Sequence, residues 1–486
     1  MSTDTRPPKI KRGASVELTL EKFADRGKSL ARVDGYVVFV PRGVPGDRVR
    51  VGIRKRKRSY AEGVIEEVLT PSPLRTDPRC TYFGTCGGCK WQHVQYDAQL
   101  EAKRQSVAEA FAHAGGFEAS TSGAVGINVL PTIGMETADG AAPFFYRNKM
   151  EFSFSARRWL TDWEIASGEQ FDTSFALGLH APGRFDAVLD LDACYLQSEW
   201  SSRLVNATRV FAKEHGWKPW AIRDHEGFLR HLVVRTPGNT DERMVVLTTN
   251  GHDAERMEAF AAMLRADFPE TTTFVNAVNT GKAQVAFGEV YHTIFGPGVV
   301  HDTIGGYRFE IAPNAFFQTN TRQAERLYAV AADFADLTPD DLVYDLYSGA
   351  GTISIYLADK VKHVVGVELI EAAVENAKAN AKANGVTNVT FAQGDMRDLF
   401  APAFIEEHGR PDVLIVDPPR AGLHPKVVEQ IGKLRPERFV YVSCNPQSQA
   451  RDLALLKDIY RVEQVQPVDL FPHTHHVEAV AKLRLR

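Results

Sequence analysis

Hydrophobic and polar positions follow a regular strand–helix rhythm in the last third of the chain. From about residue 311, apolar runs that read as strands (341–347, 363–368, 412–416 and 438–442) alternate with helical patterns at 352–358, 371–384 and 425–434. This alternation indicates a doubly wound parallel sheet, hence an α/β fold. Two more apolar runs, 462–468 and 477–485, can add closing strands.

The first 70 residues have a different pattern, with short strands at 16–20, 36–40, 48–53 and 61–68. The turn signals Asp34-Gly35 and Pro45-Gly46-Asp47 separate them, as expected for a small β-barrel. A helix is expected at 97–114, and strands at 150–154, 229–235 and 244–249 lie in a mixed α+β region without a catalytic motif. We therefore divide the chain into a barrel (10–70), a cysteine-rich segment with a helix (71–130), a central domain (131–310) and an α/β domain (311–486).

Length and composition indicate a multidomain globular enzyme. A chain of 486 residues is too long for one core, and 44 % hydrophobic and 24 % charged residues are ordinary values. No apolar run is long enough to span a bilayer, and the N-terminus lacks the apolar core of a signal peptide. We expect a cytoplasmic protein without membrane association.

Positive charge gathers at the N-terminus although the whole chain has a net charge of −4. Residues 1–60 contain 16 Lys and Arg against 6 Asp and Glu, including the basic run 54–58 between two expected strands. A basic tail that only aids solubility is the simpler interpretation, but this region also has strand patterning. Its spacing is similar to that of TRAM domains, small barrels of the oligonucleotide-binding type, and we expect it to bind RNA through phosphates.

A glycine-rich turn follows the first strand of the α/β domain, in DLYSGAGTIS (345–354). Gly349 and Gly351 let the backbone approach a ligand beside a helix N-terminus, and Glu368 ends the next strand, where a carboxylate can accept ribose hydroxyls. Ser354 replaces the third glycine of a dinucleotide motif, and the chain has no P-loop. The set looks like class I S-adenosylmethionine-dependent methyltransferases, although each glycine alone would mean only a tight turn.

Two further motifs end neighbouring strands: DPPR, which starts at Asp417, and SCNP, which contains Cys444. The carboxyl ends of parallel strands line the crevice in such sheets, so both motifs should face it. DPPR resembles the (D/N)PP(Y/F) loop of amino-methyltransferases, but Arg420 stands where an aromatic residue could stack on the target. Nitrogen methylation needs no thiolate, whereas methylation at pyrimidine carbon 5 does, because thiolate addition to carbon 6 makes carbon 5 nucleophilic.

Such a reaction also needs a base that removes the carbon-5 proton before the thiolate leaves. Glu478, in FPHTHHVEAV (471–480), is the candidate. The simpler interpretations are a strand carboxylate exposed to solvent for Glu478 and a small core residue for Cys444. The neighbouring His473, His475 and His476 lack a metal-ligand framework and are expected to shape the pocket.

At this point the chain resembles the RNA uracil-C5 methyltransferases, the family of bacterial tRNA and 23S rRNA 5-methyluridine enzymes. FFQTN, DLYSGAGT, VGVELI, DPPR, SCNP and HTHHVE occur in the family's order, and the likeness covers the whole chain. It implies a Rossmann-like methyltransferase domain, an N-terminal TRAM barrel and a central domain that binds RNA. It implies that S-adenosylmethionine contacts Gln318, Tyr347, Gly349, Gly351, Thr352, Glu368 and Asp417. Cys444 would be the nucleophile and Glu478 the base.

The chain has five cysteines, and three of them, Cys80, Cys86 and Cys89, are clustered. An odd count without a secretion signal argues against a disulfide framework and for a metal or cluster site. Together with Cys194 in LDACYLQSE, the set looks like the [4Fe-4S] site of the TRAM-containing family members. Four thiolates also suit zinc, and spacing alone does not choose between the two.

The hypothesis is therefore methylation of a uridine at carbon 5 in RNA, with 23S rRNA favoured and the tRNA T-loop as the alternative. An adenine amino-methyltransferase that uses DPPR, or an RNA-binding protein without catalysis, fits fewer of the motifs. The expected cofactors are S-adenosylmethionine and a [4Fe-4S] cluster, and the expected partner is RNA. We expect a monomer without an obligate protein partner.

Overall fold

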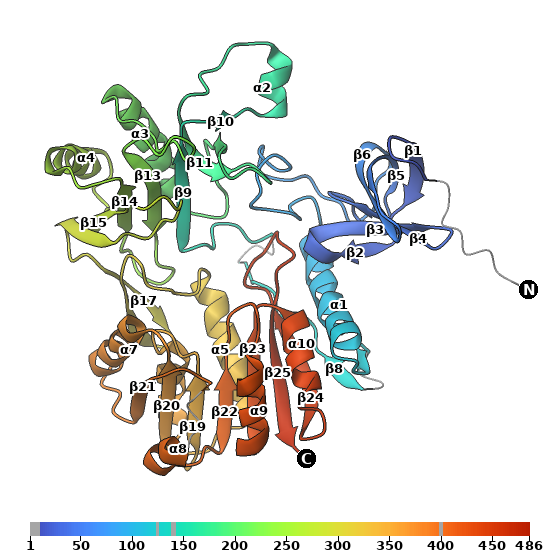
Figure 1. Ribbon diagram of the computed structural model, residues 1–486, viewed down its shortest axis with the longest axis vertical. Coiled ribbons are helices and arrows are strands. Elements are labelled where there is room, and N and C mark those ends of the chain that lie inside the picture. The colour runs from blue at the N-terminus through green and yellow to red at the C-terminus, as the bar shows by residue number, and fades with distance from the viewer. Residues whose placement is uncertain (1–9, 123–125, 138–141, 398–401) are drawn as a thin grey trace, which may run out of the picture.

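The computed structural model describes residues 10–122, 126–137, 142–397 and 402–486. Figure 1 shows three sheet-containing bodies: a small barrel that carries the N-terminus, a central body, and a large C-terminal body. The long helix α1 (Tyr96–Ala114) lies between the barrel and the C-terminal body, beside α10 (Pro446–Ala454). Among the described residues, no helix is long and apolar enough to cross a membrane.

The barrel is one six-stranded sheet in the order β1-β5-β6-β4-β3-β2. Its strands are β1 (Ser15–Thr19), β2 (Lys22–Ala24), β3 (Lys28–Val33), β4 (Tyr36–Val40), β5 (Arg48–Arg56) and β6 (Tyr60–Thr70). The four expected strands are present, but β2 and β3 were missed. A turn with Arg26 and Gly27 at positive φ, 59° and 72°, joins them. Pairing with β6 also extends β5 to Arg56, so part of the basic run lies in a strand and not in a loop.

The central body is an eight-stranded sheet in the order β10-β12-β11-β9-β13-β14-β15-β16. Its strands are β9 (Lys149–Ser155), β10 (Arg158–Trp159), β11 (Ala176–His180), β12 (Val188–Asp190), β13 (Leu229–Arg235), β14 (Met244–Thr249), β15 (Thr273–Val278) and β16 (Val290–Phe295). Its helices are α2 (Asp162–Ser167), α3 (Glu199–Glu214) and α4 (Ala254–Asp267). Residues of α3 and α4 share a hydrophobic core with β9, β13 and β14.

The C-terminal body is built on a nine-stranded sheet in the order β21-β20-β19-β22-β23-β25-β24-β8-β7. Its strands are β7 (Ala119–Ser120), β8 (Ile127–Val129), β19 (Leu342–Leu346), β20 (His363–Glu368), β21 (Val389–Gln393), β22 (Val413–Val416), β23 (Arg438–Ser443), β24 (Tyr460–Val468) and β25 (Glu478–Leu485). β19 to β23 pair in parallel, as the strand–helix rhythm predicts, and the two closing strands pair antiparallel to each other. β7 and β8 also join this sheet, because β8 pairs with β24 and β7 pairs with β8.

Helices cover both faces of this sheet, because successive strand side chains point to opposite faces. The helices are α5 (Thr321–Ala335), α6 (Thr352–Leu357) with the short turn η2 (Ala358–Lys360), α7 (Glu371–Ala383), α8 (Pro402–His408), α9 (Pro425–Leu434) and α10. One core joins α5, α6 and α7 to the hairpin of β17 (Val300–Ile304) and β18 (Tyr307–Ile311); the other joins α1, α9 and α10. The expected Rossmann-like α/β fold is confirmed.

The topology also decides where the motifs meet. β19, β20, β22 and β23 are parallel, so the loops after them emerge at one edge of the sheet. β25 runs in the opposite direction and begins at this edge with Glu478, while Ala479 pairs with Ser443 at the end of β23. The start of β25 therefore lies beside the loop that contains Cys444.

Candidate active site

Glu368 closes the glycine turn at the carboxyl edge of the sheet. Its carboxylate accepts hydrogen bonds from the N–H of Gly349 at 3.1 Å and from the N–H of Ile370 at 2.9 Å. The side chain is half-buried. Carboxylate lone pairs outnumber these two bonds, so Glu368 can still accept hydrogen bonds from a ligand such as a ribose.

The two glycines of the turn have different surroundings. Gly349 has a φ of 54°, and a Cβ there would meet nothing within 4 Å, so space is open beside it. A Cβ on Gly351 would lie 2.5 Å from the ring of Phe391, so packing beneath the turn requires glycine at this position. Tyr347, which precedes the turn, also has a positive φ of 65°. Such a backbone is sparsely populated for a bulky residue and typically marks a functional site.

The carboxyls of Asp345, which is completely buried, and of Asp417, which is half-buried, interact near the turn. Asp345 accepts a hydrogen bond from the Ser354 hydroxyl at 2.6 Å, while its Oδ1 has no hydrogen-bond partner among the described residues. Burial raises the pKa of Asp345 to about 7, and burial together with the charge of Asp345 raises the pKa of Asp417 to about 7. A buried oxygen without a partner beside an open turn fits a ligand that donates hydrogen bonds, as the amino group and hydroxyls of S-adenosylmethionine do.

Cys444 lies in a loop that is tied to the DPPR loop. The carbonyl of Arg420 accepts hydrogen bonds from Asn445 Nδ2 at 3.0 Å and from the Ser448 hydroxyl at 3.2 Å. The thiol is half-buried and free. Burial, and then the charges of Glu478 and Asp417, raise the pKa of Cys444 to about 11, while the Arg420 guanidinium acts in the opposite direction. The thiol is thus protonated at neutral pH in this structure.

Glu478 is almost completely buried, with 4 % of its surface exposed. Burial, and then the charge of Asp417, raise the pKa of its carboxyl to about 8. The simpler alternative for Glu478, a strand carboxylate exposed to solvent, is therefore wrong. The structure brings Cys444, Asp417 and Glu478 within electrostatic reach of one another at the edge where the glycine turn opens.

Gln318 and Thr352 lie at the start of α5 and of α6. The backbone carbonyl of Gln318 accepts a hydrogen bond from Asn148 Nδ2 at 2.8 Å, and its side chain bonds no other described residue. The hydroxyl of Thr352 lies 2.9 Å from that of Tyr328 on α5. Burial, and to a lesser degree the charges of the carboxyls at the sheet edge, raise the pKa of Tyr328, so α5 borders the same site.

A hydrogen-bond network holds the loop that leads into Glu478. The backbone N–H of His473 donates to Gln99 Oε1 at 2.9 Å, and its carbonyl accepts from the N–H groups of Lys90 and Trp91, both at 2.9 Å. The imidazole lies 2.8 Å from the Pro143 carbonyl. Burial lowers the pKa of His473 to about 4, so the ring is neutral. His473 therefore holds this loop in place, and whether the histidines also shape the pocket, as expected, stays a prediction.

Four cysteines from two distant parts of the chain line one cavity of about 220 Å³: Cys80, Cys86, Cys89 and Cys194. Burial, and then the neighbouring cysteines, raise the pKa of Cys86 to about 11 and of Cys89 to about 12. The sulfurs accept hydrogen bonds from the Gly88 N–H and from Gln92 Nε2. No group of three or more His, Cys, Asp or Glu side chains in the described part of the chain is arranged to hold a single metal ion.

This donor set suits either a zinc ion or an iron–sulfur cluster. A zinc ion draws its thiolates to about 2.3 Å from one point. In an iron–sulfur cluster the cysteines bind different irons, so the thiolates surround a larger volume, and hydrogen bonds to the sulfurs are common. Four cysteines on the wall of one cavity provide the thiolates that either group needs.

The sequence interpretation missed some features of the site. Leu369 and Ile370, directly after Glu368, are more than half exposed and offer apolar surface to a ligand on this turn. Asp395, after β21, is close enough to contribute to the raised pKa of Tyr347, behind the larger effect of burial. The sequence signals for these residues were the motifs VELI (367–370), at the end of β20, and GDM (394–396), directly after β21. Gln99 had no such signal because it is 374 residues from its partner His473.

Comparison with known proteins gives consistent matches. Residues 299–485 match the family described as tRNA (uracil-5-)-methyltransferase, and residues 9–65 match the TRAM domain. A Bacteroides thetaiotaomicron protein described as an uncharacterized RNA methyltransferase is 42 % identical over 96 % of this chain and 100 % of its own length. A Chlorobaculum tepidum protein with a similar description is 43 % identical over 97 % of each chain.

One solved structure is similar over nearly the whole length. It is Pyrococcus abyssi tRNA (uracil-54, C5)-methyltransferase in complex with S-adenosyl-L-homocysteine. The two chains are 27 % identical with a TM-score of 0.71, and the alignment covers 96 % of this chain and 100 % of the other. The similarity therefore extends over the barrel, the central body and the C-terminal body of this chain.

Proposed function

The chain belongs to the tRNA (uracil-5-)-methyltransferase family of RNA methyltransferases, and we propose that it methylates one specific uridine of 23S rRNA through a covalent Cys444 adduct. Family membership makes it an S-adenosylmethionine-dependent RNA (uracil-C5) methyltransferase that has RNA as its substrate. It also sets aside the adenine amino-methyltransferase and the RNA-binding protein without catalysis. The proximity of Cys444, Asp417 and Glu478 at one sheet edge supports the proposal most directly.

S-adenosylmethionine supplies an electrophilic methyl group. Glu368 would accept hydrogen bonds from the ribose, with Leu369 and Ile370 beside the adenine. Tyr347 and the open turn at Gly349 would form the wall, and Gly351 keeps that turn packed on Phe391. Gln318, Thr352 and Asp417 would complete the binding site. Buried and coupled, Asp345 and Asp417 favour a ligand with a cationic amino group, since its charge would stabilise their ionised forms.

The Cys444 thiol is partly exposed and would lose its proton to water before it reacts. Its thiolate would then form a bond to carbon 6 of the uracil, and the electron pair of the 5,6 double bond would move to the enolate. Carbon 5 thereby becomes nucleophilic and would take the methyl group as the bond between that methyl and the sulfonium sulfur breaks. Arg420 on the adjoining loop favours the thiolate, while Glu478 and Asp417 oppose it as long as they are charged.

Glu478 completes the reaction. Its carboxylate accepts the proton from carbon 5, the electron pair re-forms the 5,6 double bond, and the bond between carbon 6 and sulfur breaks. The carboxyl has a pKa of about 8, well suited to a base that gains a proton at neutral pH. β25 holds Glu478 rigidly because the residue is paired with Val468 in the sheet.

The RNA target is proposed from the layout of barrel and cysteine segment, which resembles the 23S rRNA members of the family. The second candidate is the tRNA T-loop. It is favoured by the full-length similarity to a solved tRNA (uracil-54, C5)-methyltransferase. In both cases the basic barrel (10–70) and the central domain (131–310) would bind the RNA. The cysteine-rich segment (71–130) would hold the cluster, and the α/β domain (311–486) would transfer the methyl group. The protein would act as a monomer.

We also propose that Cys80, Cys86, Cys89 and Cys194 hold a [4Fe-4S] cluster. The shared cavity of the four cysteines supports a common site, and the resemblance to the iron–sulfur members of the family favours a cluster over zinc. The cluster would tie the segment after the barrel to the central body. A structural role fits, because the adjacent Lys90 and Trp91 hold the loop before Glu478.

The test is methyl transfer in vitro. Unmodified transcripts of 23S rRNA and of tRNA are incubated with the protein and S-adenosylmethionine labelled in the methyl group, and the modified nucleosides are separated. Label in 5-methyluridine from the 23S transcript supports the proposal, and label only from the tRNA transcript supports the second candidate. Full transfer by Cys444→Ala would refute the adduct.

A further inference from the structure

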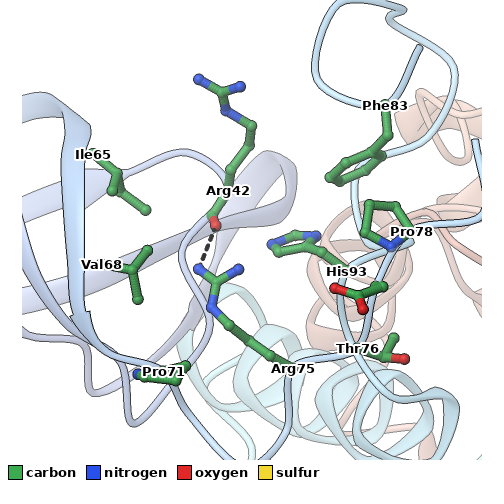
Figure 2. Close-up of a pocket in the computed structure, with 10 residues that line it drawn as sticks. Arg42, Ile65, Val68, Pro71, Arg75, Thr76, Pro78, Phe83 and His93 are labelled. Atoms are coloured by element: carbon green, nitrogen blue, oxygen red, sulfur yellow. Dashed lines mark hydrogen bonds between the residues drawn. The ribbon is translucent and has the colours of Figure 1, made fainter. Parts of the chain in front are cut away.

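A cavity of about 690 Å³ separates the barrel from the cysteine segment, outside the crevice that contains Cys444 (Figure 2). Its walls come from three parts of the chain. The barrel contributes Arg42 and two β6 side chains, the linker contributes residues 75–78, and the cysteine segment contributes Phe83 and His93. None of these residues has a role in the proposed reaction. The cavity has the size of a ligand site and not of a packing defect.

Arg42 supplies a free cation at the mouth of this cavity. The residue follows β4 with a positive φ of 61°, an unusual conformation for a side chain with a Cβ. Its guanidinium makes no hydrogen bond or ion pair within the described part of the chain, and Figure 2 shows it across the mouth from Phe83. Its Nη1 lies 2.9 Å from where a Cβ on Gly84 would be, so the glycine permits this approach.

The opposite wall is aromatic and neutral. The rings of Phe83 and His93 lie 5.0 Å apart between centroids, at 37° to each other. Burial, and then the charge of Arg75, lower the pKa of His93 to about 4, so this imidazole carries no charge. Phe83 is only partly buried, which leaves ring surface for a stacking partner.

The floor is rigid. Asp47, completely buried, accepts hydrogen bonds from Arg75 Nε and Nη2, both at 2.7 Å, and Arg75 also donates to the Arg42 carbonyl at 3.1 Å. Arg75 is therefore neutralised and fixes the turn that presents Arg42. Thr76 and Asp77 add a hydroxyl and a carboxylate, which can bond the donors on a base edge.

We infer that this cavity binds one unpaired nucleotide of the RNA substrate, separate from the uridine that is methylated. An aromatic platform with one exposed cation at the rim fits a planar base with a single phosphate, because bases stack on aromatic rings and phosphates pair with arginine. A protein segment would need no such cation opposite the rings. The inference rests on the proposed function only in taking RNA as the ligand.

RNA bound in this cavity would also contact the segment that holds the loop before Glu478. Trp91, two residues before His93, donates its backbone N–H to His473 in the loop before Glu478, and its indole donates to the Gly27 carbonyl of the barrel at 3.2 Å. A nucleotide held by Phe83 and Arg42 would thus be bound by the segment that also braces the catalytic loop. RNA that offers only the target uridine would bind more weakly.

Two substitutions test the site. Arg42→Ala removes the cation, and Phe83→Leu keeps apolar volume but removes the ring, whereas Phe83→Trp keeps a stacking surface. Binding of a labelled 23S rRNA or tRNA transcript, whichever binds the wild-type protein more tightly, is measured by filter retention. We expect Kd to rise about tenfold for Arg42→Ala and Phe83→Leu, and to stay near wild type for Phe83→Trp. Lys433→Ala, an exposed cation on α9, is the matched control.

A second readout reports the occupied cavity directly. 2-Aminopurine is placed at single unpaired positions of the transcript, and its fluorescence is followed on binding. One position other than the target should be quenched by the wild-type protein and not by Phe83→Leu. Unchanged Kd values in both variants, or quenching that is identical in Phe83→Leu, would overturn the inference even if methyl transfer is normal. Weaker RNA binding by both variants in a protein that transfers no methyl group would support the site while refuting the proposed reaction.

Discussion

The ammonium of Lys103 donates a hydrogen bond to Asp469 over 2.5 Å, and both side chains are completely buried (0 % exposed). Lys103 lies on α1, and Asp469 directly follows β24 in the loop that leads to Glu478. The pair is fully bonded, since Lys103 also donates to the Phe471 carbonyl at 3.0 Å and the Tyr96 hydroxyl donates to Asp469 at 3.0 Å. An interior ion pair therefore anchors the catalytic loop to a helix outside the catalytic domain's own sequence.

Lys103→Met should destabilise the protein strongly, because it leaves a buried carboxylate without a cation. We expect the free energy of unfolding to fall by about 3–5 kcal/mol, measured by urea denaturation. Lys103→Met/Asp469→Asn should recover part of this loss, since no buried charge remains. Equal stability of the single and double variants would show that the charge of Asp469 is not the cause.

Glu478→Gln should trap the reaction after methylation, because the proton on carbon 5 has no acceptor and the bond to Cys444 then persists. Incubation with substrate RNA and S-adenosylmethionine should give an RNA–protein species that survives denaturing gel electrophoresis. Cys444→Ala/Glu478→Gln is the control and should give none. A Glu478→Gln protein that turns over like wild type would exclude this residue as the base.

Activity should rise with pH through the neutral range. Glu478 acts as a carboxylate with a pKa of about 8, and Cys444 acts as a thiolate with a pKa of about 11, so both reactive forms become more abundant as pH increases. The measurement is kcat/KM for RNA between pH 6 and 9 at constant ionic strength. A profile that falls over this range would contradict the assigned protonation states.

The contribution of three carboxyls at the sheet edge to stability should change in the opposite direction. The pKa values of Asp345, Asp417 and Glu478 are raised to about 7, 7 and 8 from ordinary values of 3.8, 3.8 and 4.5. These three carboxyls therefore bind more protons in the folded state than in the unfolded state in this window, and their contribution to the free energy of unfolding should fall as pH rises from about 4 to 8. Asp417→Asn should flatten this dependence, as followed by urea denaturation without cofactor. An equal slope in both proteins would contradict the burial argument.

Glu368→Gln should weaken S-adenosylmethionine binding about tenfold, because hydrogen bonds to a charged acceptor contribute roughly 1.5–3 kcal/mol. Isothermal titration calorimetry gives Kd directly, and the Kd for RNA should not change. Glu371→Gln, three residues away at the start of α7, is the matched control. Equal affinity in both variants would exclude Glu368 as a ribose ligand.

Cys86→Ser should abolish the cluster. Protein purified without oxygen should contain about four irons and four acid-labile sulfides per chain, and the variant close to none. Cys444→Ala should keep the full content, since its thiol lies in the other site. One zinc per chain in the wild-type protein, without iron, would show that the four cysteines bind zinc and not a cluster.

The strand–helix rhythm of the last third could be predicted from the sequence because its signals are local. An apolar run predicts β20, and Pro425 marks the start of α9. The glycine turn predicts the site at Gly349. Each of these signals depends only on residues that are near one another in the sequence. β21 was missed because Val389–Gln393 mixes apolar and polar residues without a clear period. β2 and β3 were missed because a turn with non-glycine Arg26 at positive φ has no reliable sequence signature.

By itself the sequence determined which residues are candidates for the chemistry: Cys444 and Glu478 at strand ends, the glycine turn with Glu368, and the cluster of three cysteines with the distant Cys194. Only the tertiary structure decided how these groups behave. Sheet pairing placed β25 antiparallel beside β23, and burial then raised the pKa of Glu478 to about 8. The Lys103–Asp469 pair joins residues 366 positions apart, and no local pattern encodes such a contact, because its free energy comes from removing both charges from water together.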